Sequence, residues 1–246
     1  MDAIKLAIFD VAGTIVQDRG EVLRAFSTAL EKHGIAHTTA ELKEWKGASK
    51  QEVIRHFVRR RAKPEASESA VAAVYGDFRR ELERHYRDNG VLPIPGAAET
   101  FARLHEHGIL LATTSGFYRE ISELILELSG WHDVFSARIS SSDVLAGRPA
   151  PYMIFRAMET AGVTSVREVI NVGDTPLDLQ AGTNAGVREV VGVLTGLHGR
   201  ERLQQEPHTA LLDSVAELPC WMEGLRSDGR NSATAGHAQQ CARHTG

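Results

Sequence analysis

The chain has 246 residues, enough for one α/β domain with a small additional unit, and its 42% hydrophobic and 24% charged residues are ordinary for a globular protein. A formal net charge of −4 without a long basic stripe argues against a nucleic-acid partner. No apolar segment approaches the ~18 residues of a membrane span and the first residues lack the order of a secretory signal, so we expect a cytoplasmic protein without a membrane partner.

An apolar run at residues 4–10 predicts a buried strand that ends on a lone carboxylate, Asp10. The chain then turns through Gly13 and Thr14. A buried parallel strand presents a nucleophile at the edge of a sheet in this way, so Asp10 is the first candidate for a catalytic residue.

Residues 17–90 predict a block of helices that interrupts an α/β pattern. Apolar residues recur at helical spacing, with polar residues between them. They fall in four segments: residues 21–33, 39–46, 49–61 and 65–87. A proline-rich segment at residues 92–96 then returns the chain, so we expect an inserted all-helical cap over residues 17–90.

Strand and helix patterns alternate after this insert. Strands are predicted near residues 109–112, 134–139, 169–172 and 189–193, and helices at 97–107, 118–128 and 151–161. This alternation predicts an α/β fold, a doubly wound parallel sheet with helices on both faces. We assign residues 1–16 and 91–226 to this core, and expect the polar segment 227–246 to be a disordered tail.

Polar motifs follow several of the predicted strands. Read in chain order, they are Asp10 with Gly13-Thr14, Ser115-Gly116, Gly147-Arg148-Pro149, and Gly173-Asp174-Thr175-Pro176 with Asp178. Each motif alone is weak, but the four in this order resemble the haloacid dehalogenase (HAD) superfamily, whose core is Rossmann-like. The resemblance implies a hydrolase in which Asp10 attacks phosphorus.

The resemblance also implies a magnesium site. Mg²⁺ would be held by the carboxylates of Asp10 and Asp174 and by the backbone carbonyl of Ala12, with Asp178 as outer support. A carbonyl ligand survives the loss of a side chain, so an alanine at this position does not disable metal binding. Oxygen ligands of this kind suit Mg²⁺, a hard cation that also lowers the repulsion between an anionic nucleophile and a phosphoryl group.

The remaining motif residues would bind the transferring group. The resemblance gives this role to Thr14, Ser115 and the amide of Gly116, while Arg148 neutralises the charge and holds the nucleophile. Thr114 is an alternative to Ser115 if the strand ends one residue earlier. We prefer Ser115 because the glycine after it lets a backbone amide approach the ligand.

Ala12 departs from the usual pattern, because most phosphatases of the superfamily have a second aspartate there that protonates the leaving group. The motifs DVAGT, TTSGFYRE, AGRPAPYMIFRAME and VGDTPLDLQAGTNAG resemble the phosphonatase (phosphonoacetaldehyde hydrolase)-like branch, over residues 6–219. In that branch a cap lysine forms a Schiff base with the substrate aldehyde, so the leaving group is an enamine that needs no such acid.

Lys50 is the candidate for this lysine, because it follows the loop glycine Gly47 by three residues. Three neighbours differ from the phosphonatase pattern: Lys46 replaces a methionine, Val53 a histidine and Phe117 a tyrosine. A positive charge at residue 46 would lower the pKa of Lys50 by repulsion. Lys50 is equally well interpreted as a phosphate-binding cation that forms no imine.

Three functions therefore stay open. The first is hydrolysis of the carbon–phosphorus bond of a small phosphonate such as phosphonoacetaldehyde. The second is hydrolysis of a small phosphate monoester without a Schiff base, and the third is binding of a phosphate ligand without turnover. The resemblance also implies a homodimer paired through the cap, although packing within the cap explains the apolar stripe of residues 21–33 equally well.

Overall fold

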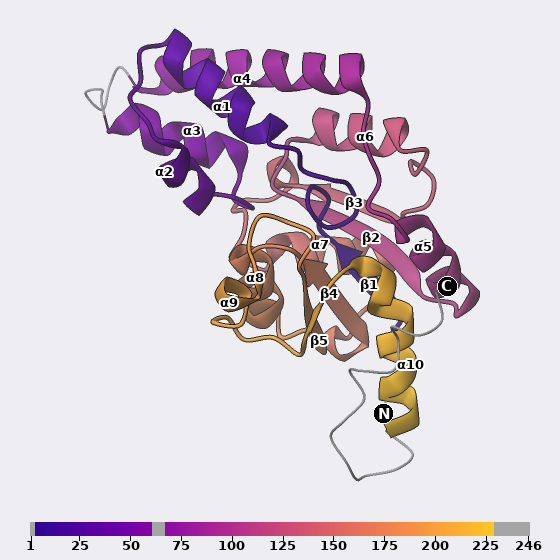
Figure 1. The fold of residues 1–246 in the computed structure, drawn as a ribbon. Helices are drawn as coiled ribbons and strands as arrows, with labels where there is room; N and C mark the ends of the chain where they lie inside the picture. Colours follow the sequence, from indigo (N-terminus) through magenta and orange to yellow (C-terminus); the bar gives the residue numbers. More distant parts are fainter. Residues whose placement is uncertain (1–2, 61–66, 229–246) are drawn as a thin grey trace.

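The computed structural model of the chain describes residues 3–60 and 67–228, and its centre is a single parallel sheet (Figure 1). The strand order is β3-β2-β1-β4-β5-β6. The strands are β1 (Leu6–Phe9), β2 (Leu110–Ser115), β3 (Ala137–Ser140), β4 (Val169–Gly173), β5 (Glu189–Val193) and β6 (Ala210–Leu212). The predicted α/β class is confirmed, and β6 is a strand that the sequence pattern did not predict.

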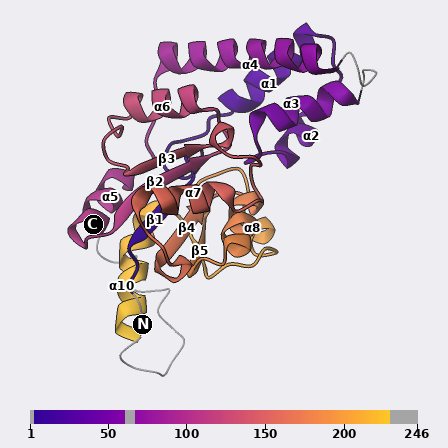
Figure 2. The same ribbon diagram turned by 180° about the vertical axis from the view of Figure 1, so that it is seen from behind.

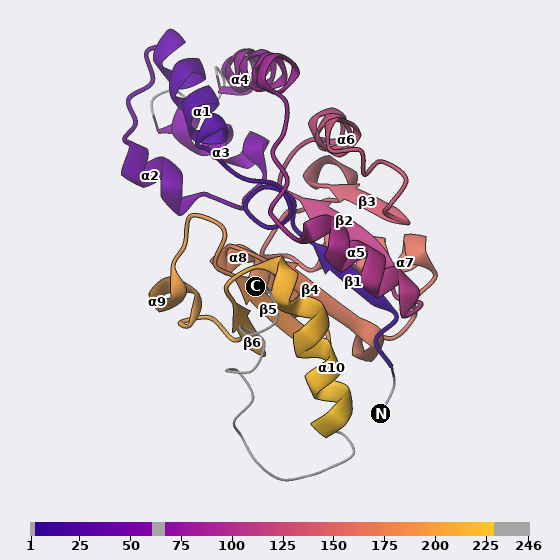
Figure 3. The ribbon, with the colours of Figure 1, turned by 45° about the vertical axis from the view of Figure 1, so that its right-hand side comes forward.

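Helices cover both faces of this sheet. Successive side chains of a strand point to opposite faces, so the apolar residues of one strand pack against helices on both sides. In β1, Ala7 and Phe9 belong to one apolar cluster, whereas Leu6 and Ile8 belong to the other. The first cluster includes residues of α5 (Ala97–Glu106), α6 (Arg119–Leu128) and α10 (Leu218–Asp228). The second includes residues of α7 (Tyr152–Ala161), α8 (Pro176–Ala185) and α9 (Arg200–Leu203). Figure 3 shows α5 and α10 in front of the sheet, and Figure 2 shows α7 on its opposite side.

The first four of the described helices between β1 and β2 form a helical unit that stands beyond the carboxyl edge of the sheet (Figure 1). They are α1 (Glu21–Lys32), α2 (Thr39–Glu44), α3 (Lys50–Arg59) and α4 (Ser67–Asn89). Their apolar faces meet, and the rings of Phe26 on α1 and Phe78 on α4 stack with centroids 4.4 Å apart. Short 3-10 helices at Ser141–Asp143, Val166–Glu168 and Val215–Glu217 complete the described elements.

Two linkers join the helical unit to the sheet and pair with each other. Gln17 N donates to Leu92 O at 2.8 Å, and Ile94 N donates to Ile15 O at 2.8 Å. The helical unit is therefore attached through one narrow double connection, which is a suitable place for a hinge.

The C-terminal helix α10 extends to Asp228, two residues into the segment 227–246 for which the composition predicts a disordered tail. The rest of that segment lies outside the described residues. None of the helices within the described ranges combines the length and the apolar composition that crossing a bilayer requires, since even the 23-residue α4 is mostly polar.

A buried hydrogen bond between α1 and α4 gives a test of the helical unit. The carboxylate of Glu21, only 4% exposed, accepts from Tyr86 Oη at 3.0 Å and from Arg19 N at 2.7 Å. Because Tyr86→Phe leaves one oxygen of a buried carboxylate without its donor, we expect the free energy of unfolding to fall by about 1–3 kcal/mol in chemical denaturation. Tyr152→Phe, on a side chain that is 45% exposed, is the control. Equal small effects of the two changes would contradict the prediction.

Candidate active site

Sheet topology brings the first and last acidic motifs together. Phe9 of β1 pairs with Val172 of β4, and Asp10 N donates to Val172 O at 2.9 Å. Asp10 and Asp174 therefore follow adjacent strands at the carboxyl edge of the sheet, which is where ligands bind in open α/β folds.

Arg148 connects the nucleophile candidate to its neighbours. Its Nη1 donates to Asp10 Oδ1 at 2.6 Å and lies 2.9 Å from Asp178 Oδ1. Its Nη2 donates to the backbone oxygen of Thr114 at 2.9 Å and to Oγ1 of the same residue at 2.8 Å. The guanidinium group is buried, so it fixes the orientation of the Asp10 carboxylate and neutralises part of the site.

Three buried carboxylates form a cluster at this edge. Asp10, Asp174 and Asp178 each offer an oxygen atom within 4.8 Å of the others. Burial raises the pKa values of Asp174 and Asp178 above the ordinary aspartate range, and repulsion by Asp10 acts in the same direction. The hydroxyl of Thr14 donates to Asp174 Oδ1 at 3.1 Å, so the loop after β1 helps to orient the carboxylate that follows β4.

The GDTP motif positions Asp178 by capping α8. Asp178 Oδ2 accepts from Thr175 N at 3.0 Å and from Thr175 Oγ1 at 2.6 Å, and Pro176 occupies the first turn. Gly173 is needed here because a Cβ atom at that position would lie 2.3 Å from the Cβ of Asp178. Oδ2 of Asp178 thus caps the first turn of α8, and Oδ1 faces Arg148.

The carboxylate cluster fits a divalent cation. Asp174 Oδ2 and Asp178 Oδ1 are buried, and their polar neighbours among the described residues are ion-pair partners, Lys46 at 3.2 Å and Arg148 at 2.9 Å. The three converging carboxylates repel one another, and hard oxygen ligands of this kind suit a divalent cation. Ala12 lies on the same loop, two residues after Asp10.

The loop between α2 and α3, residues 45–49, closes over this edge of the sheet. Lys50 N donates to Gly116 O at 3.2 Å. A Cβ atom at residue 116 would lie 2.5 Å from Ala48 O, and one at Gly47 would lie 2.5 Å from Thr175 Oγ1. Gly116 therefore allows the α2–α3 loop to approach closely. From the sequence alone, we expected this glycine to let a backbone amide approach a ligand.

Lys50 begins α3, and its side chain is buried at the same site. Its Nζ donates to Ala48 O at 3.3 Å and lies 4.9 Å from the ring centre of Phe117. Burial lowers the pKa of Lys50 to about 8; repulsion from Arg148 acts in the same direction, whereas Asp10 opposes it. Roughly a tenth of such side chains are neutral at pH 7.

The two hydroxyl candidates at the end of β2, Thr114 and Ser115, have different partners. The strand extends to Ser115, as the sequence interpretation preferred, and Ser115 Oγ accepts from Phe117 N at 3.1 Å. Thr114 instead accepts from Arg148 through its hydroxyl. The alternative candidate thus supports the arginine, and the preferred one is the last residue of the strand.

The contacts of two charged residues at the site, Lys46 and Asp18, were not predicted from the sequence. Lys46 Nζ lies 3.2 Å from Asp174 Oδ2 and 3.0 Å from Asp18 Oδ2. Repulsion by Lys46 contributes to the lowered pKa of Lys50, as the sequence suggested, but its contact with Asp174 was missed. The only available signal was that Lys46 shares a short loop with Lys50.

The segment after β5 also lines the site. Thr195 Oγ1 donates to Gly13 O at 2.6 Å. A Cβ atom at Gly196 would lie 1.8 Å from Asp174 Oδ2, so only glycine fits beside that carboxylate. This gives a physical role to the start of the 194–213 segment, for which the sequence pattern offered none.

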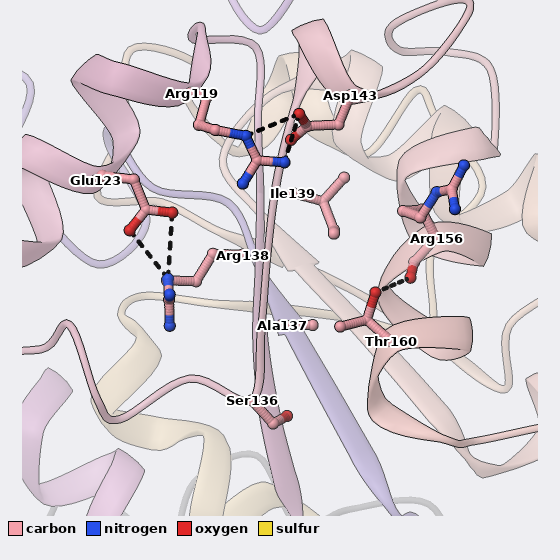
Figure 4. Close-up of a pocket in the computed structure, with 9 residues that line it drawn as sticks. All are labelled: Arg119, Glu123, Ser136, Ala137, Arg138, Ile139, Asp143, Arg156 and Thr160. Carbon is pink, nitrogen blue, oxygen red and sulfur yellow. Dashed lines mark hydrogen bonds and ion pairs between the residues drawn. The ribbon is translucent and has the colours of Figure 1, made fainter.

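A separate pocket lies along the edge strand β3 (Figure 4). Two of its arginines are already paired, because Arg119 Nη2 donates to Asp143 at 2.6 Å and Arg138 Nε donates to Glu123 at 3.0 Å. These two arginines are thus engaged by carboxylates, unlike an arginine free to hold a phosphoryl group.

Comparison with known proteins agrees with this geometry. Residues 7–193 match the family described as haloacid dehalogenase-like hydrolase. The chain is 30% identical to a phosphonoacetaldehyde hydrolase of Parabacteroides distasonis, over 92% of this chain and 98% of that protein. Similar folds include a phosphonoacetaldehyde hydrolase-like protein from Oleispira antarctica (TM-score 0.81, 22% identity, 95% and 96% covered). Another is a putative β-phosphoglucomutase from Bacteroides vulgatus (TM-score 0.79, 21% identity, 92% and 90% covered).

Proposed function

The chain belongs to the haloacid dehalogenase-like hydrolase family, and from this premise we propose that it is a magnesium-dependent hydrolase of the carbon–phosphorus bond in a small phosphonate with an aldehyde group, such as phosphonoacetaldehyde. The relative from Parabacteroides distasonis supports this substrate class. The observation that carries the proposal is the burial of the Lys50 amine at the site of Asp10, which lowers the pKa of this amine.

The proposed first step belongs to Lys50. Its neutral amine attacks the substrate aldehyde, water leaves, and a protonated imine forms. Asp10 then attacks phosphorus and forms an aspartyl phosphate, while the electron pair of the carbon–phosphorus bond moves into the imine and gives an enamine. Water hydrolyses the aspartyl phosphate to phosphate, and protonation and hydrolysis of the enamine release acetaldehyde and the free lysine.

Charges at the site assist this attack. Arg148 holds Asp10 and neutralises phosphoryl oxygens, while Ser115, Gly116 and Thr14 surround the transferring group in the proposed arrangement. A Mg²⁺ ion bound by Asp10, Asp174 and the carbonyl of Ala12, with Asp178 beside it, would lower the repulsion between carboxylate and phosphoryl group. The helical unit α1–α4 would act as the cap, which excludes water when its α2–α3 loop closes.

An alanine at residue 12 is compatible with an enamine leaving group. The imine accepts the electron pair of the breaking bond, so no side chain beside Asp10 has to supply a proton in that step. An alkoxide leaving group would need one. The missing acid thus favours a phosphonate aldehyde over an ordinary phosphate ester.

One observation favours a second function, hydrolysis of a phosphate monoester without an imine. Lys50 lies over the apolar ring of Phe117, and Val53, one helical turn after it, is also buried and apolar. Neither residue can move protons during imine formation. Lys50 would then act as a cation that binds the phosphoryl group, on a substrate with a good leaving group.

Trapping by borohydride tests the proposal. We expect the protein, incubated with phosphonoacetaldehyde, Mg²⁺ and borohydride, to gain a reduced two-carbon adduct on Lys50, located by peptide mass spectrometry. Because only the neutral amine attacks and burial lowers the pKa of Lys50 to about 8, the initial rate of trapping should rise with pH to about 8 and then level off.

Phosphate release is measured in parallel without borohydride. Lys43, an exposed lysine on α2, serves as the internal control and should carry no adduct. Release of phosphate from aryl phosphates alone, with no adduct on Lys50, would reject the imine and favour the second function.

A further inference from the structure

Lys46 occupies a position that the proposed reaction does not use. Its Nζ bridges Asp18 and Asp174, at 3.0 Å and 3.2 Å, and its side chain is only 10% exposed. Both partners are carboxylates at ion-pair distance, which favours the charged form of the amine. The residue is therefore a buried cation in contact with the carboxylate cluster.

The atom that Lys46 faces is the one that a metal ion would need. Asp174 Oδ1 accepts from Thr14, whereas the polar contact of Asp174 Oδ2 among the described residues is its ion pair with Lys46. Close contacts surround Oδ2, since Cβ atoms at Gly13 and Gly196 would lie 2.5 Å and 1.8 Å from it. Little space is left on this side of the carboxylate, so the Lys46 ammonium and a metal ion compete for one oxygen.

Lys46 also belongs to a different part of the molecule from Asp174. It lies in the α2–α3 loop of the helical unit, and Asp174 follows β4 of the sheet. Asp18, the second partner, lies on the linker between β1 and α1. The ion pair therefore holds the helical unit on the sheet through the same carboxylate that would bind the cation.

We infer that Lys46 is an internal competitor of the divalent cation, which holds Asp174 Oδ2 when the metal is absent and must leave it when the metal binds. Metal entry is thereby coupled to the loss of one contact between the α2–α3 loop and the sheet, while the hydrogen bond from Lys50 N to Gly116 O still holds the loop in place. This inference rests on the proposed use of a divalent cation, and it concerns metal affinity rather than the reaction.

Direct titration of Mg²⁺ into the full chain, after chelator treatment and without substrate, tests the inference. Lys46→Met removes the charge at similar length, and close charge pairs have coupling energies that correspond to about tenfold or more in affinity. We therefore expect calorimetry to give a Kd for Mg²⁺ at least about tenfold lower than that of the wild type. Lys43→Met makes the same charge change on an exposed side chain and should leave this Kd unchanged.

Two further measurements keep the inference testable if Lys46→Met does not fold. Lys46→Gln should show the same tighter binding and a larger rise in melting temperature with Mg²⁺. In the wild type, acetylation of Lys46 by an amine-reactive reagent should be faster with Mg²⁺ than without it, because the ammonium has left Asp174.

The outcomes separate this inference from the proposed function. If wild type and Lys46→Met bind Mg²⁺ with the same Kd, or the variant binds more weakly, Lys46 does not compete and the inference fails, while the proposed function stands. If neither binds Mg²⁺, the magnesium part of the proposed function fails together with the inference.

Discussion

Asp10→Asn is expected to abolish phosphate release, with a loss in kcat of about 10⁴-fold or more, the scale seen when a nucleophile is removed. The amide keeps the shape of the side chain but has no negative charge with which to attack phosphorus. Arg148 Nη1, 2.6 Å from Asp10 Oδ1, still finds an acceptor in the amide oxygen. Folding should therefore survive, because the variant also relieves repulsion among three buried carboxylates.

The measurement is phosphate release from phosphonoacetaldehyde and from an aryl phosphate, compared with phosphate binding by calorimetry. Both activities should disappear together, since both require the same nucleophile, while phosphate still binds. Asp133→Asn, at a side chain that is 98% exposed, is the control and should retain full activity. More than a few per cent of residual turnover in Asp10→Asn would show that another group attacks phosphorus.

The elements that the sequence predicted best are those with a clear period or a continuous apolar run. The buried run that ends at Asp10 is β1, and the stripes of the insert are α1 to α4. Helix α8 was missed because its second half, AGTNA, has no apolar stripe. A Cβ atom at Gly182 would lie only 3.0 Å from Val190, so small residues there allow close packing. The three-residue β6 is too short to show a period.

The candidate site was predictable as far as topology determines it. Asp10, Ser115 and Asp174 each stand at a predicted strand end, so a parallel sheet must bring them to one edge. The structure places Arg148 against Asp10 as expected from the resemblance. The roles of these residues stay predictions until variants are measured.

The contacts of Lys46 could not be predicted, because they depend on how the helical unit closes on the sheet. Its partners Asp18 and Asp174 lie 28 residues before it and 128 residues after it, and neither spacing carries a periodic signal. The same holds for Gly196, whose need for glycine arises only where the segment after β5 passes Asp174.

Lys50→Arg is expected to separate the two candidate activities. A guanidinium group keeps the positive charge but cannot give the neutral amine that attacks an aldehyde. If Lys50 forms the imine, the rate of carbon–phosphorus cleavage should fall more than about 10³-fold, a loss on the scale of removing one member of a concerted catalytic set. Hydrolysis of an aryl phosphate, which needs only the charge, should persist.

Because Lys50 is buried, the larger arginine also changes the packing, and a second substitution separates the effect of packing from that of chemistry. Lys50→Met fits the same volume without a charge, so it should lose carbon–phosphorus cleavage and also weaken aryl phosphate hydrolysis, chiefly through a higher KM. Lys43→Arg, on the exposed face of α2, should change neither activity. A parallel loss of both activities in Lys50→Arg, with unchanged melting temperature, would mean that Lys50 binds the phosphoryl group and forms no imine.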